Sequence, residues 1–384
     1  MKKLFQVILM LPWLGAAFAA EPATDTMVDV GSYKLHFHVI KGHGTPILFE
    51  SGGGDDETVW HDLLPPLADL TQTTLIAYDR PGFGKSGLDT NRHSIKDNLD
   101  DLEKGLKALG YDGKLILVAH SLGGFYATLY AARHPDAVQG AVLVDANLVC
   151  FFTPEHVAAN EQPNEALRMK FKDSRPGLSY LYGEITSTVA LMRQTPFPTR
   201  IPLIDIVSDK TPFRNDADIQ LWKSCHRQFA DEANNRQGIV ANDAGHYVYK
   251  ANPALVINAI AKIYAATLPD RERLALLDRA LGYNLDAANQ ARKQQAEYRH
   301  SEDDLNDWGY QLMARGEKQR AIDVFKLSVE LHPASANVYD SLAESYEALG
   351  DKRQAIANYQ HSLQLKPSNE HAKERLRVLQ TAPN

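Results

Sequence analysis

The segment from Lys114 to Pro135, KLILVAHSLGGFYATLYAARHP, constrains the fold of this chain more than any other segment. Its first part is a β-prone apolar run, and its second part has the spacing of a helix. Ser121 stands at the junction. A strand that passes directly into a helix is typical of a parallel α/β sheet. The segment therefore predicts such a sheet, and it leaves two interpretations of Ser121 open: an incidental residue of an ordinary strand-turn-helix, or a hydroxyl that the turn presents.

Short β-prone runs alternate with helical patterns between residues 28 and 265. This alternation predicts an α/β fold, with a mostly parallel sheet flanked by helices. Gly31 and Ser32 separate the first two runs and indicate a hairpin. The expected strands are MVDV, YKLHFHVI, PILFE, TTLIAYD, KLILVAH, GAVLVDA, PLIDIVS and GIVAND, and the expected helices lie near 95–109, 122–133, 219–232 and 253–266.

Two segments do not fit this alternation. About 55 residues separate GAVLVDA from PLIDIVS, too many for a plain crossover connection. This insertion, about 148–200, is rich in Phe, Tyr, Leu and Met, and we expect it to form a helical lid over the carboxyl end of the sheet, where open α/β sheets bind ligands. Residues 268–300 are charged and have helical spacing, and are expected to form a helical connector.

The junction reads Ala119-His120-Ser121-Leu122-Gly123 and resembles the nucleophile elbow of the α/β-hydrolase superfamily, G-x-S-x-G. Alanine replaces the first glycine, and the tight turn tolerates it because alanine is the next smallest residue. AYDRPGFGKSG, residues 77–87, is a further resemblance to this superfamily. The resemblance implies an α/β-hydrolase domain over residues 20–267, with Ser121 as its nucleophile.

A serine hydroxyl needs a base that removes its proton, and an acid that orients the base. His246 follows the last expected strand, where the superfamily has its catalytic histidine. The acid stays open between two residues. Asp145 follows the sixth expected strand, and Asp209 follows the seventh but is out of register with the usual spacing, so we lean slightly to Asp145. Asp205, within a strand, is a weaker third choice.

The negative charge of a tetrahedral intermediate needs fixed N–H donors. LFESGGGDD follows the third expected strand, where the superfamily has its oxyanion loop. The resemblance implies the backbone N–H groups of Gly53 and Leu122 as donors, with Gly52 as an open alternative to Gly53. No lysine follows the glycines as it does in a P-loop, which disfavours a phosphate site.

Charge and motifs disfavour several other functions. The net charge is −7 and the Lys and Arg residues are scattered, so we expect no nucleic-acid partner. The dinucleotide-binding pattern G-x-G-x-x-G is absent between a strand and a helix. His36 and His38 share one face of an expected strand, but no third ligand stands nearby in the sequence. We therefore expect no metal and no cofactor.

Residues 301–384 contain a repeat with an offset of 34 residues. The period and the matched residue types resemble tetratricopeptide repeats, in which a glycine lies in the turn of a helix hairpin and an alanine where two helices approach closely. The resemblance implies an all-α domain that binds a protein partner or mediates self-association. The matched pairs are Gly316 and Gly350, Ala321 and Ala355, Phe325 and Tyr359, Leu331 and Leu365, and Pro333 and Pro367.

Residues 1–19 have two lysines, an apolar run and then small residues, which is the layout of a secretory signal peptide. We expect cleavage after Ala19 and a periplasmic or secreted protein. The apolar run is short for a membrane-spanning helix. Export would place Cys150 and Cys225 in an oxidising compartment, where a disulfide and two separate thiols both remain open.

These features predict an exported serine hydrolase that cleaves a small-molecule carboxylic ester or amide through an acyl-enzyme intermediate. The alternative is a non-catalytic scaffold or peptide-binding protein that acts through its repeats. The intact Ser121, His246 and glycine loop favour the enzyme. No segment after the signal peptide is apolar enough to span a bilayer, so no integral membrane segment is expected after cleavage.

Overall fold

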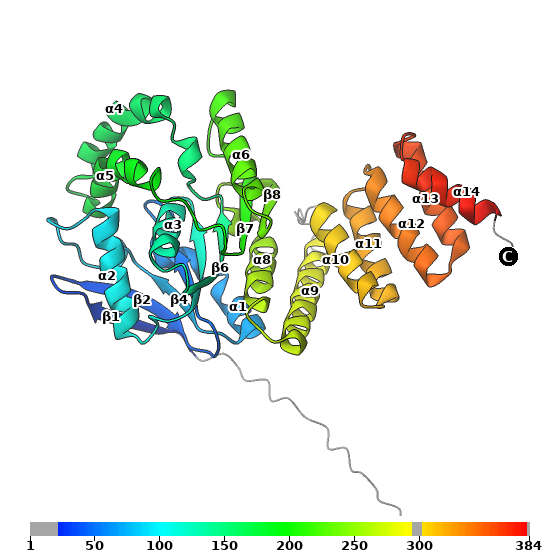
Figure 1. Ribbon diagram of the computed structural model, residues 1–384, viewed down its shortest axis with the longest axis horizontal. Coiled ribbons are helices and arrows are strands. Elements are labelled where there is room, and N and C mark those ends of the chain that lie inside the picture. Colours follow the sequence, from blue (N-terminus) through cyan, green and yellow to red (C-terminus); the bar gives the residue numbers. More distant parts are fainter. Residues whose placement is uncertain (1–21, 294–301, 382–384) are drawn as a thin grey trace, which may run out of the picture.

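A computed structural model describes residues 22–293 and 302–381. The expected signal peptide, residues 1–19, and the end of the expected connector lie outside these residues. Figure 1 shows a domain built around a sheet and, beyond the helix α9 (Asp270–Lys293), a row of helices that leads to the C-terminus. No helix among the described residues is long and apolar enough to cross a membrane.

The sheet has eight strands in the order β1-β2-β4-β3-β5-β6-β7-β8. β2 pairs antiparallel with β1 and β4, and every other neighbouring pair is parallel, which confirms the expected mostly parallel sheet. The strands are β1 (Thr24–Asp29), β2 (Lys34–Ile40), β3 (Ile47–Glu50), β4 (Leu75–Tyr78), β5 (Leu115–His120), β6 (Val138–Val144), β7 (Leu203–Lys210) and β8 (Arg236–Gly245).

Helices cover both faces of the sheet because successive strand residues point to opposite faces. Leu115 and Leu117 of β5 belong to one apolar cluster, and Ile116 and Val118 belong to the other. The first cluster lies under α2 (Ile95–Ala108), α3 (Gly123–Arg133) and α6 (Asp216–Asp231), and the second lies under α1 (Leu64–Thr71) and α8 (Pro253–Ala265).

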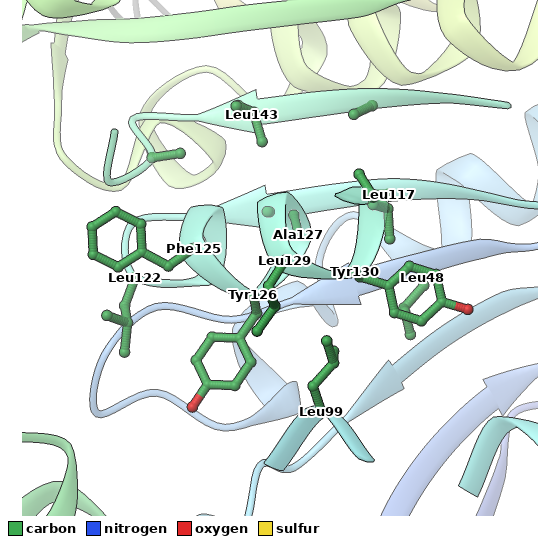
Figure 2. Packing of buried hydrophobic residues seen from close by; sticks show 14 of the residues in the cluster. Leu48, Leu99, Leu117, Leu122, Phe125, Tyr126, Ala127, Leu129, Tyr130 and Leu143 are labelled. Carbon is green, nitrogen blue, oxygen red and sulfur yellow. The ribbon is translucent and has the colours of Figure 1, made fainter. Parts of the chain in front are cut away.

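The helix α3 is held firmly because one of its faces is buried against the sheet. Figure 2 shows Phe125, Ala127 and Leu129 of α3, which belong to the same apolar cluster as Leu117 of β5 and Leu143 of β6. All five side chains are almost completely buried. Full burial of a large apolar side chain contributes about 1.5–3 kcal/mol. This packing fixes the N-terminus of α3, where Ser121 stands, relative to the sheet.

The insertion between β6 and β7 contains η2 (Val149–Phe151), α4 (Pro154–Phe171) and α5 (Pro176–Met192). α4 and α5 form a helix hairpin, and Val189 and Met192 of α5 join the apolar cluster beneath it. Cys150 of η2 is disulfide-bonded to Cys225 of α6, which answers the question that the sequence left open. The bridge ties the start of the insertion to a helix that packs on β7 and β8.

The C-terminal helices form successive hairpins and are consistent with the expected repeats. Gly316 and Gly350 occupy the turns with φ of 78° and 91°, a backbone region that favours glycine. Ala321 and Ala355 are fully buried where paired helices meet. The helices are α10 (Glu302–Ala314), α11 (Lys318–Leu331), α12 (Ala336–Leu349), α13 (Lys352–Leu365) and α14 (Glu370–Thr381), and the short helices η1 (Glu57–Trp60) and α7 (Val248–Ala251) belong to the sheet domain.

Candidate active site

Ser121 lies in the turn between β5 and α3 with a φ of 51°, in the left-handed region that few non-glycine residues adopt. The turn is closed by the backbone N–H of Asn147, which donates to the Ser121 carbonyl at 2.7 Å. Gly123 has no room for a side chain, because a Cβ there would lie 2.6 Å from the Glu50 carbonyl oxygen. The turn therefore depends on glycine two residues after Ser121, and it places the hydroxyl at the N-terminus of α3.

Three side chains from distant parts of the chain form one hydrogen-bonded series. His246 Nε2 lies 3.0 Å from Ser121 Oγ, and His246 Nδ1 lies 2.7 Å from Asp145 Oδ2. His246 follows β8, and Asp145 follows β6 with a φ of 45°. The parallel strands bring these residues together because their carboxyl ends meet at the same edge of the sheet.

Asp145 is fully buried and has several hydrogen-bond donors. Its Oδ1 accepts from the Ser208 backbone N–H at 2.8 Å and from Trp222 Nε1 at 3.0 Å, and its Oδ2 also accepts from the Ser208 hydroxyl at 2.8 Å. Burial alone would raise the pKa of Asp145, but the hydrogen bond and charge of His246, together with these donors, lower it below its usual value. The carboxylate is thus held ionised beside His246.

The glycine loop after β3 is held through its carbonyl groups. The buried Arg80 guanidinium donates to the Ser51 carbonyl at 2.6 Å and also to the Gly52 carbonyl. Within the described residues, the backbone N–H groups of Gly53 and Leu122 donate to no protein acceptor, and both residues line the cavity beside Ser121. These two N–H groups are therefore available to a bound molecule.

His120, the residue before Ser121, supports the loop that carries His246. Its Nε2 lies 3.1 Å from the His246 backbone carbonyl, and its ring lies 4.6 Å from the His246 ring. Burial, with the nearby His246 charge, lowers the pKa of His120 to about 3. The ring is therefore neutral at ordinary pH, and its Nε2–H donates to the carbonyl.

A cavity of about 290 Å³ opens beside Ser121 and His246. Its walls come from the insertion, from the β7–α6 connection and from the turn after β5. None of the lining residues is Lys, Arg, Asp or Glu. The apolar walls include Phe151, Phe152, Val157, Leu181, Ile185, Val189, Phe213 and Trp222, and the polar groups besides Ser121 and His246 are Asn147, His156, Asn160, Asn164 and Tyr182.

Comparison with known proteins places this architecture in a family. Residues 45–179 match the model of the family described as alpha/beta hydrolase fold. This match supports a member of the α/β-hydrolase superfamily. The α/β-hydrolase fold class predicted from the sequence is thereby confirmed. A crystal structure of an aCif variant has the same fold, with a TM-score of 0.50 and 20% identity over 63% of this chain and 88% of that chain.

Curated relatives are similar to part of the chain, and two of them are a Bacillus and a Mesorhizobium protein. The chain is 24% identical over 223 residues to the uncharacterized protein YqjL of Bacillus subtilis (strain 168), covering 58% of this chain and 85% of that protein. It is 31% identical over 174 residues to 2-(acetamidomethylene)succinate hydrolase of Mesorhizobium japonicum, covering 44% of this chain and 59% of that enzyme. The match thus spans about three fifths of that enzyme. Family and relatives together support a hydrolase.

The α/β-hydrolase domain does not bring the other two aspartates to His246. Asp209 follows Ser208, but its carboxylate turns away and pairs with Lys223 of α6 at 2.9 Å. That contact lowers the pKa of Asp209. Asp205 is buried in β7 and pairs with His226 at 2.7 Å.

Sequence reasoning did not single out the groups that hold the series in place. Trp222 and Ser208 donate hydrogen bonds to Asp145, and His120 contacts the backbone carbonyl of His246. Trp222 lies in an amphipathic helix, where a tryptophan is ordinary core material, so no local signal distinguished it. Arg80, from the segment 77–87 that resembles the superfamily, binds the glycine loop.

Proposed function

We propose that this α/β-hydrolase is a serine hydrolase that cleaves carboxylic esters, or amides, through an acyl-enzyme intermediate. Ser121 is its nucleophile, His246 its general base and acid, and Asp145 the residue that orients His246. The observation that most supports these roles is the contact of 3.0 Å between Ser121 Oγ and His246 Nε2, a distance suited to proton transfer.

In the first half of the proposed reaction, His246 Nε2 accepts the Ser121 proton while Oγ attacks the carbonyl carbon. The imidazolium that forms is stabilised by the ionised Asp145, whose Oδ2 lies 2.7 Å from Nδ1. His246 then gives the proton from Nε2 to the leaving oxygen or nitrogen. The bond to the leaving group breaks, and the acyl group remains on Ser121.

In the second half, His246 removes a proton from water, and the hydroxide attacks the acyl carbon. The bond to Ser121 Oγ breaks as His246 returns its proton to that oxygen, and the free acid leaves. Both tetrahedral intermediates need donors for their oxyanion. We assign the backbone N–H groups of Gly53 and Leu122 to this role, and the fact that Gly53 lines the cavity supports it over Gly52.

The cavity favours a substrate with a neutral, largely apolar acyl or alkyl group. No fixed charge lines it, so a carboxylate or ammonium on the substrate would lose its hydration without gaining a partner. The name of the Mesorhizobium relative specifies a succinate derivative as the substrate of that enzyme. For this protein, we expect neutral esters to react faster than monoesters of dicarboxylic acids, which keep a free carboxylate.

Fluorophosphonate labelling tests the nucleophile, because such a probe bonds to an activated serine. We expect wild-type protein to be labelled at Ser121, and Ser121→Ala to be unlabelled and to lack turnover of neutral p-nitrophenyl esters. Asp209→Asn is a matched control that should keep both properties. A folded wild-type protein with neither labelling nor turnover would overturn the proposal and leave the repeat helices as the working part.

We also propose that the protein is exported after cleavage at Ala19. The composition of residues 1–19 and the disulfide between Cys150 and Cys225 support this, because disulfides persist in oxidising compartments. Mass spectrometry of the purified protein gives its N-terminus, and fractionation of cells gives its compartment. A cytoplasmic protein that keeps residues 1–19 would contradict the proposal.

A further inference from the structure

A second cluster of chemically capable side chains lies outside the active-site cavity. His38 of β2, Glu57 of η1 and His61, just after η1, each offer one ligand atom, and the three atoms lie within 4.8 Å of one another. None of the three residues lines the active-site cavity. We propose that this cluster, the β2–η1 cluster, binds a divalent transition-metal ion of the Zn²⁺ type.

The donor set suits that class of ion. Two imidazole nitrogens and one carboxylate oxygen are a common ligand set for Zn²⁺, which takes them at about 2.0–2.2 Å and leaves a fourth position for water. Ligand atoms around such an ion lie roughly 3.3 Å apart, by tetrahedral geometry from those bond lengths. The side chain of His61 is 44% exposed and can adjust, whereas Glu57 is buried and fixed.

Asp25 prepares His38 for this role. Its Oδ1 lies 2.8 Å from His38 Nδ1, and its Oδ2 accepts from Lys85 Nζ at 2.7 Å. A carboxylate that accepts from one imidazole nitrogen fixes the tautomer and leaves the lone pair of the other nitrogen free. This is the usual arrangement around histidines that bind metals, and here it directs Nε2 of His38 to be the ligand atom.

The buried carboxylate of Glu57 favours a cation beside it. Its side chain is only 2% exposed, and its Oε2 lies 2.5 Å from His61 Nε2. A buried ionised carboxylate is costly unless positive charge compensates it. The Glu57 backbone N–H donates to Asp79 Oδ1 at 2.9 Å, so η1 holds this side chain in a defined place.

An open hollow gives an ion access to the cluster. A cavity of about 380 Å³ is lined by His38 and His61, by Asp69 of α1, and by apolar residues of β2, of α1 and of the segment before β1. An entry path and an open coordination position are both requirements of an exchangeable metal site.

A neighbouring group shares Glu57 but is a poorer candidate. His36, Glu57 and Asp79 also lie close together, and all three are buried. The Asp79 oxygens are already occupied, since they accept from the backbone N–H groups of Glu57 and Lys85 and contact His36 Nδ1 at 2.8 Å. This inner group therefore holds loops together, and the outer cluster keeps its nitrogen ligands at the surface.

The test uses full-length mature protein without a histidine tag, stripped of metal with a chelator. Zn²⁺ affinity is measured by competition with a chromophoric chelator, and Co²⁺ absorption reports the coordination. We expect one Zn²⁺ per chain with a micromolar or lower Kd. His38→Gln and His61→Gln should each weaken binding at least 100-fold, and Asp25→Asn by about 10- to 100-fold.

Two controls keep the result interpretable. His361→Gln changes a surface histidine of the repeat helices, and His246→Gln removes the histidine of the candidate active site; both should bind Zn²⁺ as wild type does. The exposure of His61 makes its variant safe for folding, which circular dichroism verifies. Wild-type binding weaker than about 100 μM, or affinity unchanged in His61→Gln, would overturn the proposal.

Discussion

Two histidine–aspartate pairs lie close together in this molecule and differ mainly in what faces the histidine. His246 with Asp145 and His226 with Asp205 both have a contact of 2.7 Å. Asp145 and Asp205 are almost completely buried. The side chain of His246 is 22% exposed and its second nitrogen faces Ser121, whereas that of His226 is 1% exposed and its second nitrogen has no hydrogen-bond partner.

The difference separates the proposed catalytic arrangement from a structural one. A buried carboxylate beside an imidazole fixes the ring in either case, and proton transfer also needs a free ring nitrogen that reaches a reacting group. His226 has no such route, because it is enclosed by β7, Trp222 and the core of the domain. Geometry of the pair alone is thus a poor indicator of function, and access to the second nitrogen is the informative property.

The largest effect is expected when the carboxylate of the first pair is neutralised. Asp145→Asn should lower kcat by about 10⁴-fold, because the amide favours the wrong tautomer of His246. Asp209→Asn, which changes an exposed partner of Lys223, should leave kcat within a few-fold. Steady-state kinetics with a neutral ester measure both, and equal losses in the two variants would contradict the assignment of the acid.

The corresponding change in the second pair should affect stability instead. Asp205→Asn leaves the buried His226 without its counter-charge, which typically costs about 3–5 kcal/mol. Urea denaturation measures the loss in the free energy of unfolding. The kcat of the folded variant should stay within a few-fold of wild type, and a collapse of kcat without loss of stability would show that the two pairs are not distinct.

Trp222 connects the two pairs, since it donates to Asp145 and packs on the His226 ring. Trp222→Phe keeps most of the packing and removes one donor to the carboxylate. One hydrogen bond to a charged group contributes about 1.5–3 kcal/mol, so we expect kcat to fall about 10- to 100-fold. The pH profile should shift as well, and an unchanged profile with unchanged kcat would show that this donor does not position Asp145.

The smallest expected effect is a pH dependence of stability. Burial alone would lower the pKa of His226, but the charge and hydrogen bond of Asp205 outweigh it and raise the pKa above its usual value. A raised pKa in the folded state means that the stabilisation is complete below about pH 6.5 and is lost as the pH rises through the folded-state pKa. The difference in unfolding free energy between wild type and His226→Gln should therefore shrink above pH 6.5, and a difference that grows with pH would refute this sign.

Much of the fold follows from local patterns. The strands were predictable because each is a short apolar run bounded by turn residues, as in KLILVAH before Ser121. The turn at Ser121 was also predictable from a local pattern, because it needs small residues beside the serine. A side chain at Gly123 would collide with the backbone of Glu50. His246 was singled out by its place after the last strand.

The choice between Asp145 and Asp209 could not be made from the sequence. It depends on the direction of a side chain at the end of a strand. Trp222 and Ser208 donate hydrogen bonds to Asp145, whereas Lys223 donates to Asp209. The same limit applied to His38, because its neighbours Glu57 and His61 come from η1 and its C-terminal end, which follow β3. Contacts between distant segments decide such questions, and spacing along the chain does not encode them.

The disulfide between Cys150 and Cys225 makes the stability of the folded protein depend on whether these cysteines are oxidised. It encloses a span of 75 residues that includes α4, α5 and β7, so a reduced chain has to order this part of the cavity wall from a less restricted unfolded ensemble. In the chain-entropy model, reduction lowers the free energy of unfolding by about 4 kcal/mol. That corresponds to roughly a thousandfold smaller ratio of folded to unfolded molecules.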